Sequence, residues 1–78
     1  MWQDTIQETF EFKNFSQALN FVNTVGELAE KADHHPTITM HDYKKVTITL
    51  TTHSEGKVTE KDHNLAKQIE DKYNGKMQ

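Results

Sequence analysis

Two adjacent histidines stand immediately before the only proline of the chain, in the stretch Asp33-His34-His35-Pro36. Histidine suits general acid–base chemistry at neutral pH because its unperturbed pKa is about 6.5. Adjacent side chains in an extended segment point in different directions. The two imidazoles therefore cannot serve one site in the same way, and a residue distant in the sequence is expected to complete the site.

Three further histidines are His41, His53 and His63. His41 falls at a predicted turn, and His63 falls in the first turn of a predicted helix, away from its apolar side, so both are expected to be solvated. His53 ends a predicted strand on the side that does not cover the core. Local pattern alone leaves open whether His34, His35 and His53 are ordinary surface residues or functional ones.

Other kinds of active site fit the sequence less well. A metal site is the weaker alternative, since there is no cysteine and no His-x-x-x-His pair, and neighbouring histidines converge poorly on one ion. There is no Gly-x-Ser-x-Gly motif for covalent catalysis, and Ser54 simply follows His53 in a predicted loop. The three glycines are isolated, so no phosphate-binding loop is expected. Acid–base chemistry without a metal or a covalent intermediate remains.

The composition predicts one small domain that spans residues 1–78. A core of this size leaves roughly 3–5 kcal/mol of net stability, and the chain has no disulfides because it has no cysteine, so a homo-oligomer is expected. The formal charge of −3, with acids and lysines interspersed, argues against nucleic acid as a partner. No apolar run approaches the roughly 20 residues of a membrane-spanning helix, and the first residues lack a secretory signal. We therefore expect a cytoplasmic protein.

Apolar periodicity predicts the elements that position these residues. Ile6, Phe10 and Phe12 share one parity of a first strand, although Glu8 on that parity weakens the pattern. A helix from about residue 15 to 32 follows, with Asn14 as its N-cap and Gln17 completing a capping box. Its predicted apolar stripe comprises Phe15, Ala18, Leu19, Val22, Val25, Ala29 and Ala32.

The second half of the chain reads as two strands and a helix. Ile38 and Met40 begin a strand, residues 42–44 form a turn, and residues 45–53 form the clearest strand, with Val46, Ile48 and Leu50 facing one side and Thr47, Thr49, Thr51 and His53 the other. Thr59 and Asp62 resemble a capping box that opens a second helix, which Asn74-Gly75 should close. The predicted fold is an α+β sandwich of two layers: an antiparallel sheet of three to four strands with two helices packed on one face.

The spacing of these residues resembles a known family. Six residues separate Pro36 from Tyr43, nine separate Tyr43 from His53, and eight separate His53 from Asp62. Together with Ala29-Glu30 and the segments FEFKNF, YKKVTITLTTH and TEKDHNLAKQIE, this pattern resembles the pterin-4a-carbinolamine dehydratases from about Phe10 to Tyr73. Five residues between proline and tyrosine are more common in that family, and Thr37 and Ile38 stand where an aromatic often follows.

The resemblance implies an activity and a set of site residues. Such enzymes remove water from a 4a-hydroxy-tetrahydropterin released by aromatic amino acid hydroxylases, and they use no metal or organic cofactor. The family's catalytic histidines fall on His34, His35 and His53. Its substrate-binding positions fall on Glu30, Asp33, Pro36, Thr52, Ser54 and Glu55. The resemblance also implies a homodimer or homotetramer and functional coupling to such a hydroxylase.

A division of labour between the histidines follows as a hypothesis. His34 and His53 would exchange protons with the pterin, His35 would hold it, and Glu30 would orient an imidazole or the ring. Two alternatives stay open: a non-catalytic binding or regulatory module that retains the fold, and a pterin-related enzyme with another substrate. Retention of all three histidines together with Glu30 favours the enzyme over a pure scaffold.

Overall fold

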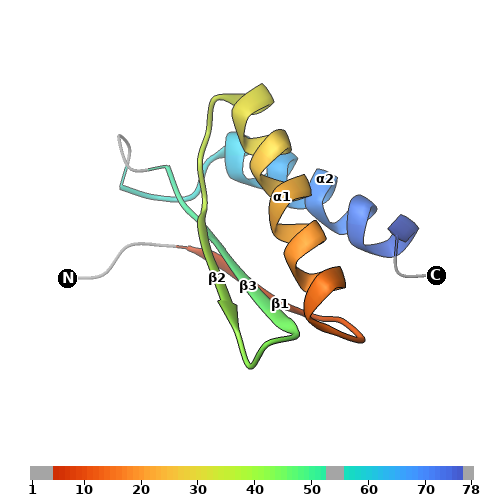
Figure 1. The fold of residues 1–78 in the computed structure, drawn as a ribbon. Helices are drawn as coiled ribbons and strands as arrows, with labels where there is room; N and C mark the ends of the chain where they lie inside the picture. Colours follow the sequence, from red (N-terminus) through yellow and green to blue (C-terminus); the bar gives the residue numbers. More distant parts are fainter. Residues whose placement is uncertain (1–4, 53–55, 77–78) are drawn as a thin grey trace.

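The computed structural model describes residues 5–52 and 56–76, which fold into five elements in the predicted order (Figure 1). The strands are β1 (Ile6–Glu11), β2 (Thr37–His41) and β3 (Lys45–Leu50). The helices are α1 (Phe15–Ala32) and α2 (Glu60–Lys76). The prediction of the first helix is confirmed at both ends.

The three strands form one antiparallel sheet in the order β1-β3-β2. Both helices lie on the same side of this sheet (Figure 1). This arrangement confirms the predicted two-layer α+β sandwich, with three strands in the described part of the chain. Strand β3 is the central strand, and Thr52, two residues after its end, contacts Asp62 at the start of α2.

The core fills the space between the sheet and the helices. Along β3, buried Val46, Ile48 and Leu50 alternate with partly exposed residues, as the period of two predicts. Four aromatic rings from three regions of the chain pack with centroids 4.9 to 6.0 Å apart; they belong to Phe10, Phe12, Phe21 and Tyr73. The aromatic cluster joins β1 to both helices.

The predicted apolar stripe of α1 is rotated in the structure. The buried residues are Ala18, Phe21, Val25 and Ala29, whereas Phe15 is 53% exposed and Leu19 is 42% exposed. Successive residues turn by about 100° around a helix axis, so Phe15 and Leu19 lie on one shoulder of α1 beside the buried face. The sequence prediction of Phe15, Leu19 and Ala32 as core residues was therefore wrong, and it missed Phe21.

Two predicted boundaries also differ from the structure. Strand β3 ends at Leu50, and Thr51 is buried instead of facing outward, because the alternation of a strand no longer applies beyond its end. Thr52 then pairs with Lys57 in an isolated bridge. Helix α2 continues through Asn74 and Gly75 to Lys76, since Gly75 does not adopt the left-handed conformation that would end the helix.

Glu8 is the one acid on the inward parity of β1. It faces Ile48 across the sheet and is half-buried. Burial raises the pKa of Glu8, and a hydrogen bond and charge repulsion from Glu70 of α2 raise it further. The folded state therefore favours the neutral form of Glu8, and this contribution to stability is present below 4.5, the ordinary pKa, and is lost as the pH rises through the folded value.

Replacement of Glu8 by glutamine should stabilise the protein at pH 7. The Glu8→Gln variant removes an ionised carboxylate that is half-buried beside Glu70, and we expect a gain of about 0.5–1 kcal/mol in the free energy of unfolding. Urea unfolding at pH 7 and below pH 4 measures the gain, which should disappear at the acidic pH. Glu70→Gln should give a similar gain, and the double variant should add little. An equal gain at both pH values would contradict this assignment.

Candidate active site

The histidine pair leaves α1 through a sharp helix ending. Asp33 adopts the left-handed conformation with φ of 52°, its N–H donates to the carbonyl oxygen of Glu30 at 3.2 Å, and the N–H of His34 donates to that of Ala29 at 3.1 Å. These are the two hydrogen bonds of a Schellman motif, whose left-handed residue is usually glycine. Asp33 thus has a structural role in addition to the predicted contact with substrate.

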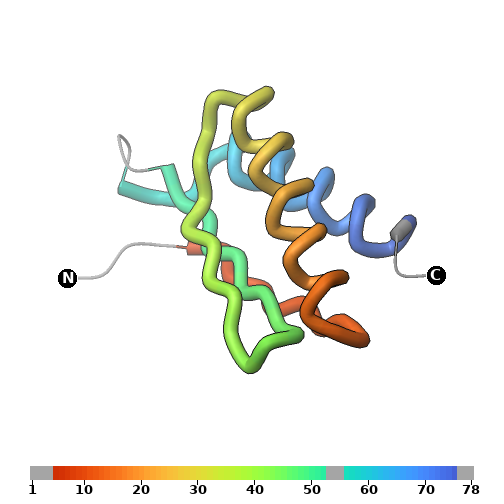
Figure 2. The backbone as a smooth tube through the Cα atoms, in the orientation of Figure 1, coloured from red at the N-terminus to blue at the C-terminus, as the bar shows by residue number. Residues whose placement is uncertain are grey.

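His34 points inward, toward the start of α2. Its Nε2 lies 2.6 Å from Oδ1 of Asp62, and the His34 side chain is 12% exposed while that of Asp62 is 0% exposed. Figure 2 shows the backbone after α1 passing the start of α2, which lies far away in sequence. The distant residue expected to complete the site of one histidine is therefore Asp62.

The carboxylate of Asp62 is held by two further donors. Its Oδ2 accepts a hydrogen bond from the hydroxyl of Thr52 at 2.8 Å and another from the backbone N–H of Thr59 at 2.9 Å. The hydroxyls of Thr52 and Thr59 are 2.7 Å apart. The bond from the Thr59 N–H confirms one half of the predicted capping box, whereas the Thr59 hydroxyl contacts Thr52 and not the backbone of Asp62. The bond from Thr52 connects α2 to the end of β3.

These contacts decide the charge of Asp62. Burial alone would raise the pKa of Asp62, but hydrogen bonds from His34, from the backbone of Thr59 and from Thr52, with the nearby charge of His34, hold it below the ordinary 3.8. A carboxylate that accepts several hydrogen bonds is stabilised in its ionised form. Asp62 is therefore an anion at neutral pH, and it can orient the ring of His34.

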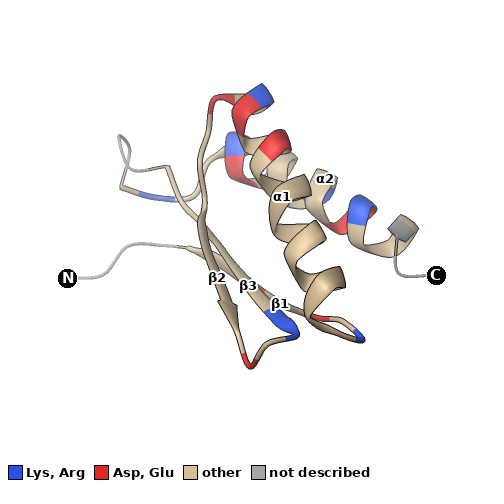
Figure 3. Cartoon of the chain, viewed as in Figure 1, with Lys and Arg blue, Asp and Glu red and all other residues tan. Residues whose placement is uncertain are grey.

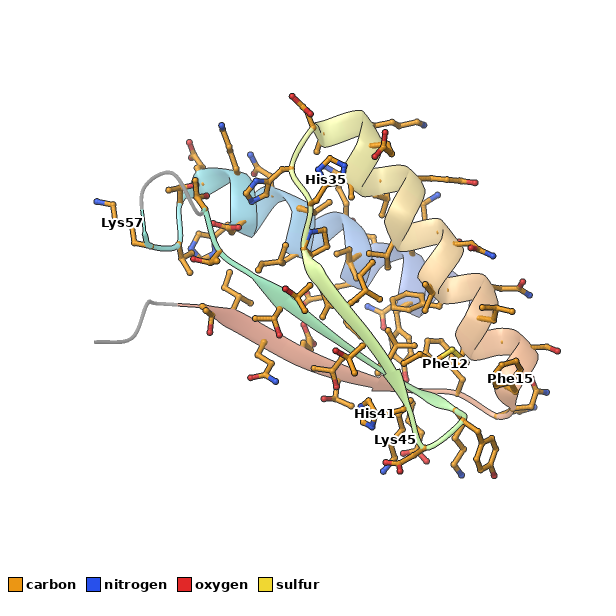
Figure 4. All side chains as sticks on the ribbon, turned by 60° about the vertical axis from the view of Figure 1, so that its left-hand side comes forward. Phe12, Phe15, His35, His41, Lys45 and Lys57 are labelled. Carbon is orange, nitrogen blue, oxygen red and sulfur yellow. The ribbon has the colours of Figure 1, made fainter. Side chains whose placement is uncertain are left out.

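His35 points to the other side of the segment. Its Nε2 lies 2.7 Å from Oε2 of Glu30, and the two side chains are 56% and 78% exposed. Figure 4 shows His35 between the end of α1 and the start of β2, at the opposite end of β2 from His41. An exposed pair of this kind contributes little to stability, so His35 and Glu30 are available for contact with a ligand.

An open groove adjoins His35 and Glu30. Its volume is about 770 Å³, and it runs between α1 and the first residues of β2. The floor includes Gly26, where an added Cβ would meet no atom within 4 Å. The groove is lined by Asn23, Gly26, Glu27, Ala29, Glu30, Lys31, His35, Pro36 and Ile38. Gly26 therefore has no close-packing role, and its lack of a side chain leaves the groove wider.

The predicted site residues divide into two sets. Thr52 and His34 meet through Asp62, while Glu30, His35 and Pro36 share the groove. Asp33 connects the two sets by ending α1. His53, Ser54 and Glu55 lie outside the described residues, so their assignment as catalytic or substrate-binding residues stays a prediction.

Sequence reasoning missed the part that Asp62 plays in the site. Its position nine residues after His53 was part of the family spacing, and its place three residues after Thr59 indicated a helix cap. Neither signal predicted that the same carboxylate reaches back to His34. The two remaining histidines differ: His63 is exposed as predicted, whereas His41 is partly buried and lies 2.8 Å from the hydroxyl of Thr47.

Within residues 5–52 and 56–76, no three His, Asp or Glu side chains are grouped so that they could hold a metal ion. The helices of the same residues include none that is long and apolar enough to cross a membrane. The polar groups of the described site are imidazoles, carboxylates and threonine hydroxyls.

The fold and the paired histidines define a small α+β protein with a candidate acid–base site, and comparison with known proteins identifies its family. Residues 1–72 match the family described as pterin 4 alpha carbinolamine dehydratase. The chain belongs to this family.

Individual relatives support the same assignment. The chain is 56% identical over 61 residues to a protein from Picosynechococcus. The aligned residues make up 78% of this chain and 65% of the relative's length. It is 50% identical over 66 residues to a protein from Thermomicrobium roseum, with 85% of this chain and 70% of the relative covered. Both carry a provisional name as pterin-4-alpha-carbinolamine dehydratases.

Solved structures show the same fold. A transcriptional coactivator/pterin dehydratase from Brucella melitensis superposes with a TM-score of 0.84 at 39% identity, over 91% of this chain and 74% of that one. A pterin dehydratase-like RuBisCO assembly factor of the alpha-carboxysome superposes with a TM-score of 0.70 at 23% identity, over 83% of this chain and 74% of that one. The second likeness concerns the fold alone.

Two substitutions at Asp62 should separate its two roles. Asp62→Asn keeps an oxygen that can accept from the N–H of Thr59 but loses the charge next to His34. Asp62→Ala loses both and leaves buried donors without a partner, so we expect a loss of about 3 kcal/mol in the free energy of unfolding, and a smaller loss for Asp62→Asn.

The pH dependence gives a second measurement on the same variants. Because the pKa of Asp62 is lowered, its contribution to stability is present above 3.8 and is lost as the pH falls through the folded value. Urea unfolding should therefore show a difference between the natural chain and Asp62→Asn that is present at pH 7 and shrinks in acid. A difference that persists unchanged at pH 2 would contradict the assignment.

Proposed function

We propose that the protein catalyses the dehydration of a 4a-hydroxy-tetrahydropterin to a quinonoid dihydropterin and water. The observation that carries this proposal is the buried His34–Asp62 pair, next in sequence to the exposed His35–Glu30 pair, in a chain that belongs to the pterin 4 alpha carbinolamine dehydratase family. The reaction needs groups that donate and accept protons at neutral pH, and these pairs are of that kind.

The chemistry has two proton transfers. An imidazolium protonates the oxygen on C4a, and the bond between C4a and that oxygen breaks as the lone pair of the adjacent ring nitrogen forms a carbon–nitrogen double bond. A second base then accepts the proton from that nitrogen, so that one water leaves and no oxidant is consumed. We assign the proton exchange to His34 and His53, where the charge of Asp62 would stabilise the imidazolium form of His34.

The groove next to His35 is the proposed place for the pterin ring. Pro36, Ala29 and Ile38 offer apolar contact to a flat ring system, while Glu30 and His35 can hydrogen-bond its nitrogen-rich edge. Asp33, Thr52, Ser54 and Glu55 complete the proposed contacts with substrate. We also propose that the protein is cytoplasmic and that it is functionally linked to an aromatic amino acid hydroxylase.

Direct assay of the dehydration tests the function. The 4a-hydroxy-tetrahydropterin is generated with a hydroxylase, and its decay is followed by absorbance with and without the protein. We expect acceleration by the natural chain, and a loss of at least roughly 100-fold in His34→Ala and in His53→Ala, as for the removal of a general acid or base.

His63→Ala is the matched control, because His63 is exposed and adjacent in sequence to Asp62. It should keep full activity. A folded natural chain that gives no acceleration over the spontaneous reaction would rule out the dehydratase and bring forward the non-catalytic module or a different pterin substrate.

A homo-oligomer remains part of the proposal, and the exposed shoulder of α1 is its proposed contact. Phe15 and Leu19 are exposed there, and no charged residue occurs between Phe15 and Gly26. Figure 3 shows this half of α1 free of charge, with acidic and basic residues gathered at its other end. The same surface suits a protein partner if the chain serves as a binding module, the second candidate function.

A charge on this shoulder should dissociate the oligomer. Light scattering after gel filtration should give a mass above 9.1 kDa, the mass of one chain, for the natural protein and 9.1 kDa for Leu19→Glu and Phe15→Glu. Gln68→Glu on exposed α2 is the control and should keep the larger mass. A natural chain of 9.1 kDa would contradict self-association and leave the shoulder to another protein.

A further inference from the structure

The hydrogen bond between His34 and Asp62 has a defined direction. Asp62 is an anion with a side chain 0% exposed, so both its oxygens can only accept hydrogen bonds. At 2.6 Å, Nε2 of His34 must therefore carry the hydrogen that it shares with Oδ1. The other ring nitrogen, Nδ1, has no hydrogen-bond partner among the described residues. In the neutral ring, Nδ1 is then the basic nitrogen.

The orientation of Asp62 itself is set by donors on its second oxygen. Oδ2 accepts from the Thr52 hydroxyl at 2.8 Å and from the Thr59 N–H at 2.9 Å, which leaves Oδ1 for His34. Since the hydrogen of the Thr52 hydroxyl is used on Asp62, the Thr59 hydroxyl must donate to Thr52 across their 2.7 Å contact. The order of donation is Thr59 to Thr52, and Thr52 to Asp62.

We propose that Thr52 is a positioning residue, whose hydroxyl fixes Asp62 so that His34 keeps its hydrogen on Nε2 and exchanges the reaction proton through Nδ1. This inference rests on the proposed dehydration for its catalytic part. Thr52 thus acts through Asp62, in addition to any contact with substrate.

Thr52 differs from the other donor in where it comes from. The Thr59 N–H belongs to the same helix start as Asp62 and would follow it in any movement. Thr52 follows the central strand, is only 5% exposed, and is fixed by backbone hydrogen bonds with Gly56 and Lys57 at 2.8 and 3.1 Å. Its hydroxyl is therefore the contact that holds the carboxylate relative to the sheet. Without it, Asp62 could turn about its terminal bond, and its oxygen would no longer be held at Nε2 of His34.

The other charged groups near His34 do not replace Asp62. Glu30 is 78% exposed and is bound to His35, and Asp33 is exposed at the end of α1. On α2, Lys61 and His63 flank Asp62 in sequence and are exposed. Among the described residues, Asp62 is the charged side chain within hydrogen-bond distance of His34.

Nitrogen-15 NMR of histidine-labelled protein tests the assignment without reference to activity. In the natural chain, neutral His34 should show the chemical shifts of the tautomer with hydrogen on Nε2. Thr52→Val has nearly the same shape but no hydroxyl, and it should give a mixture of the two tautomers. Thr52→Ser restores the hydroxyl and should restore the single tautomer. In Thr52→Val, carbon-13 NMR should also show a higher pKa for the Asp62 carboxyl.

Kinetics tests the catalytic part. Thr52→Val should lower kcat for dehydration by about 10-fold to 100-fold with little change in KM, as expected when a catalytic group is misplaced rather than removed. Its pH–rate profile should shift, whereas Thr52→Ser should keep the natural profile. A merely structural role would lower the amount of folded protein without moving the profile of the folded fraction.

The outcomes decide separately on the positioning role of Thr52 and on the proposed dehydration. A natural chain whose neutral His34 has its hydrogen on Nδ1 overturns the inference, and this needs no variant to fold. A folded Thr52→Val with an unchanged tautomer and pH profile also overturns it. If Thr52→Val does not fold, Thr59→Val, which removes the hydroxyl behind Thr52, should give a smaller change in the same direction. Absence of dehydration in the natural chain refutes the proposed function, while the NMR result still decides the role of Thr52.

Discussion

The buried carboxylate of Asp62 is the interaction on which the rest of the site depends. It accepts hydrogen bonds from the N–H of Thr59 at the start of α2, from the hydroxyl of Thr52 just after β3, and from His34 just after α1. An ionised group with no exposure to water is costly unless its oxygens are fully hydrogen-bonded. Three separate segments must therefore come together around Asp62, and the requirement to satisfy one charge fixes their relative positions.

The left-handed residue at the end of α1 explains why two adjacent histidines point to different surroundings. Asp33 turns the chain at a left-handed residue, and Pro36 favours an extended backbone at His35, the residue before it. His34 is thereby directed into the protein, where it contacts a fixed carboxylate, and His35 is directed to a groove open to solvent. One side chain is nearly buried against a carboxylate, and the other is more than half exposed.

The sequence predicted the elements well and the contacts between them less well. The bounds of α1 and the alternation of Val46, Ile48 and Leu50 follow from local rules, namely a cap, a helix ending and a period of two. The choice of Phe21 over Phe15 for the core does not, because both fit a helical period and the packing of β1 and Tyr73 decides between them. Asp62 was predicted only as a helix cap. Its contact with His34 was not predicted, because the two residues are 28 positions apart and no local pattern marks such a contact.

The contact between His34 and Asp62 also connects the site to the folding of the whole chain. Because its two residues are far apart in sequence, it forms only after the loop between them has closed, and the first turn of α2 must be in place. Asp62 sits in that turn, one helical turn before the buried Leu65. Fraying of α2 from its N-terminus would thus dismantle the site while the sheet is still intact. Any ligand that requires the ordered His34 would, by mass action, slow hydrogen exchange in the first turns of α2.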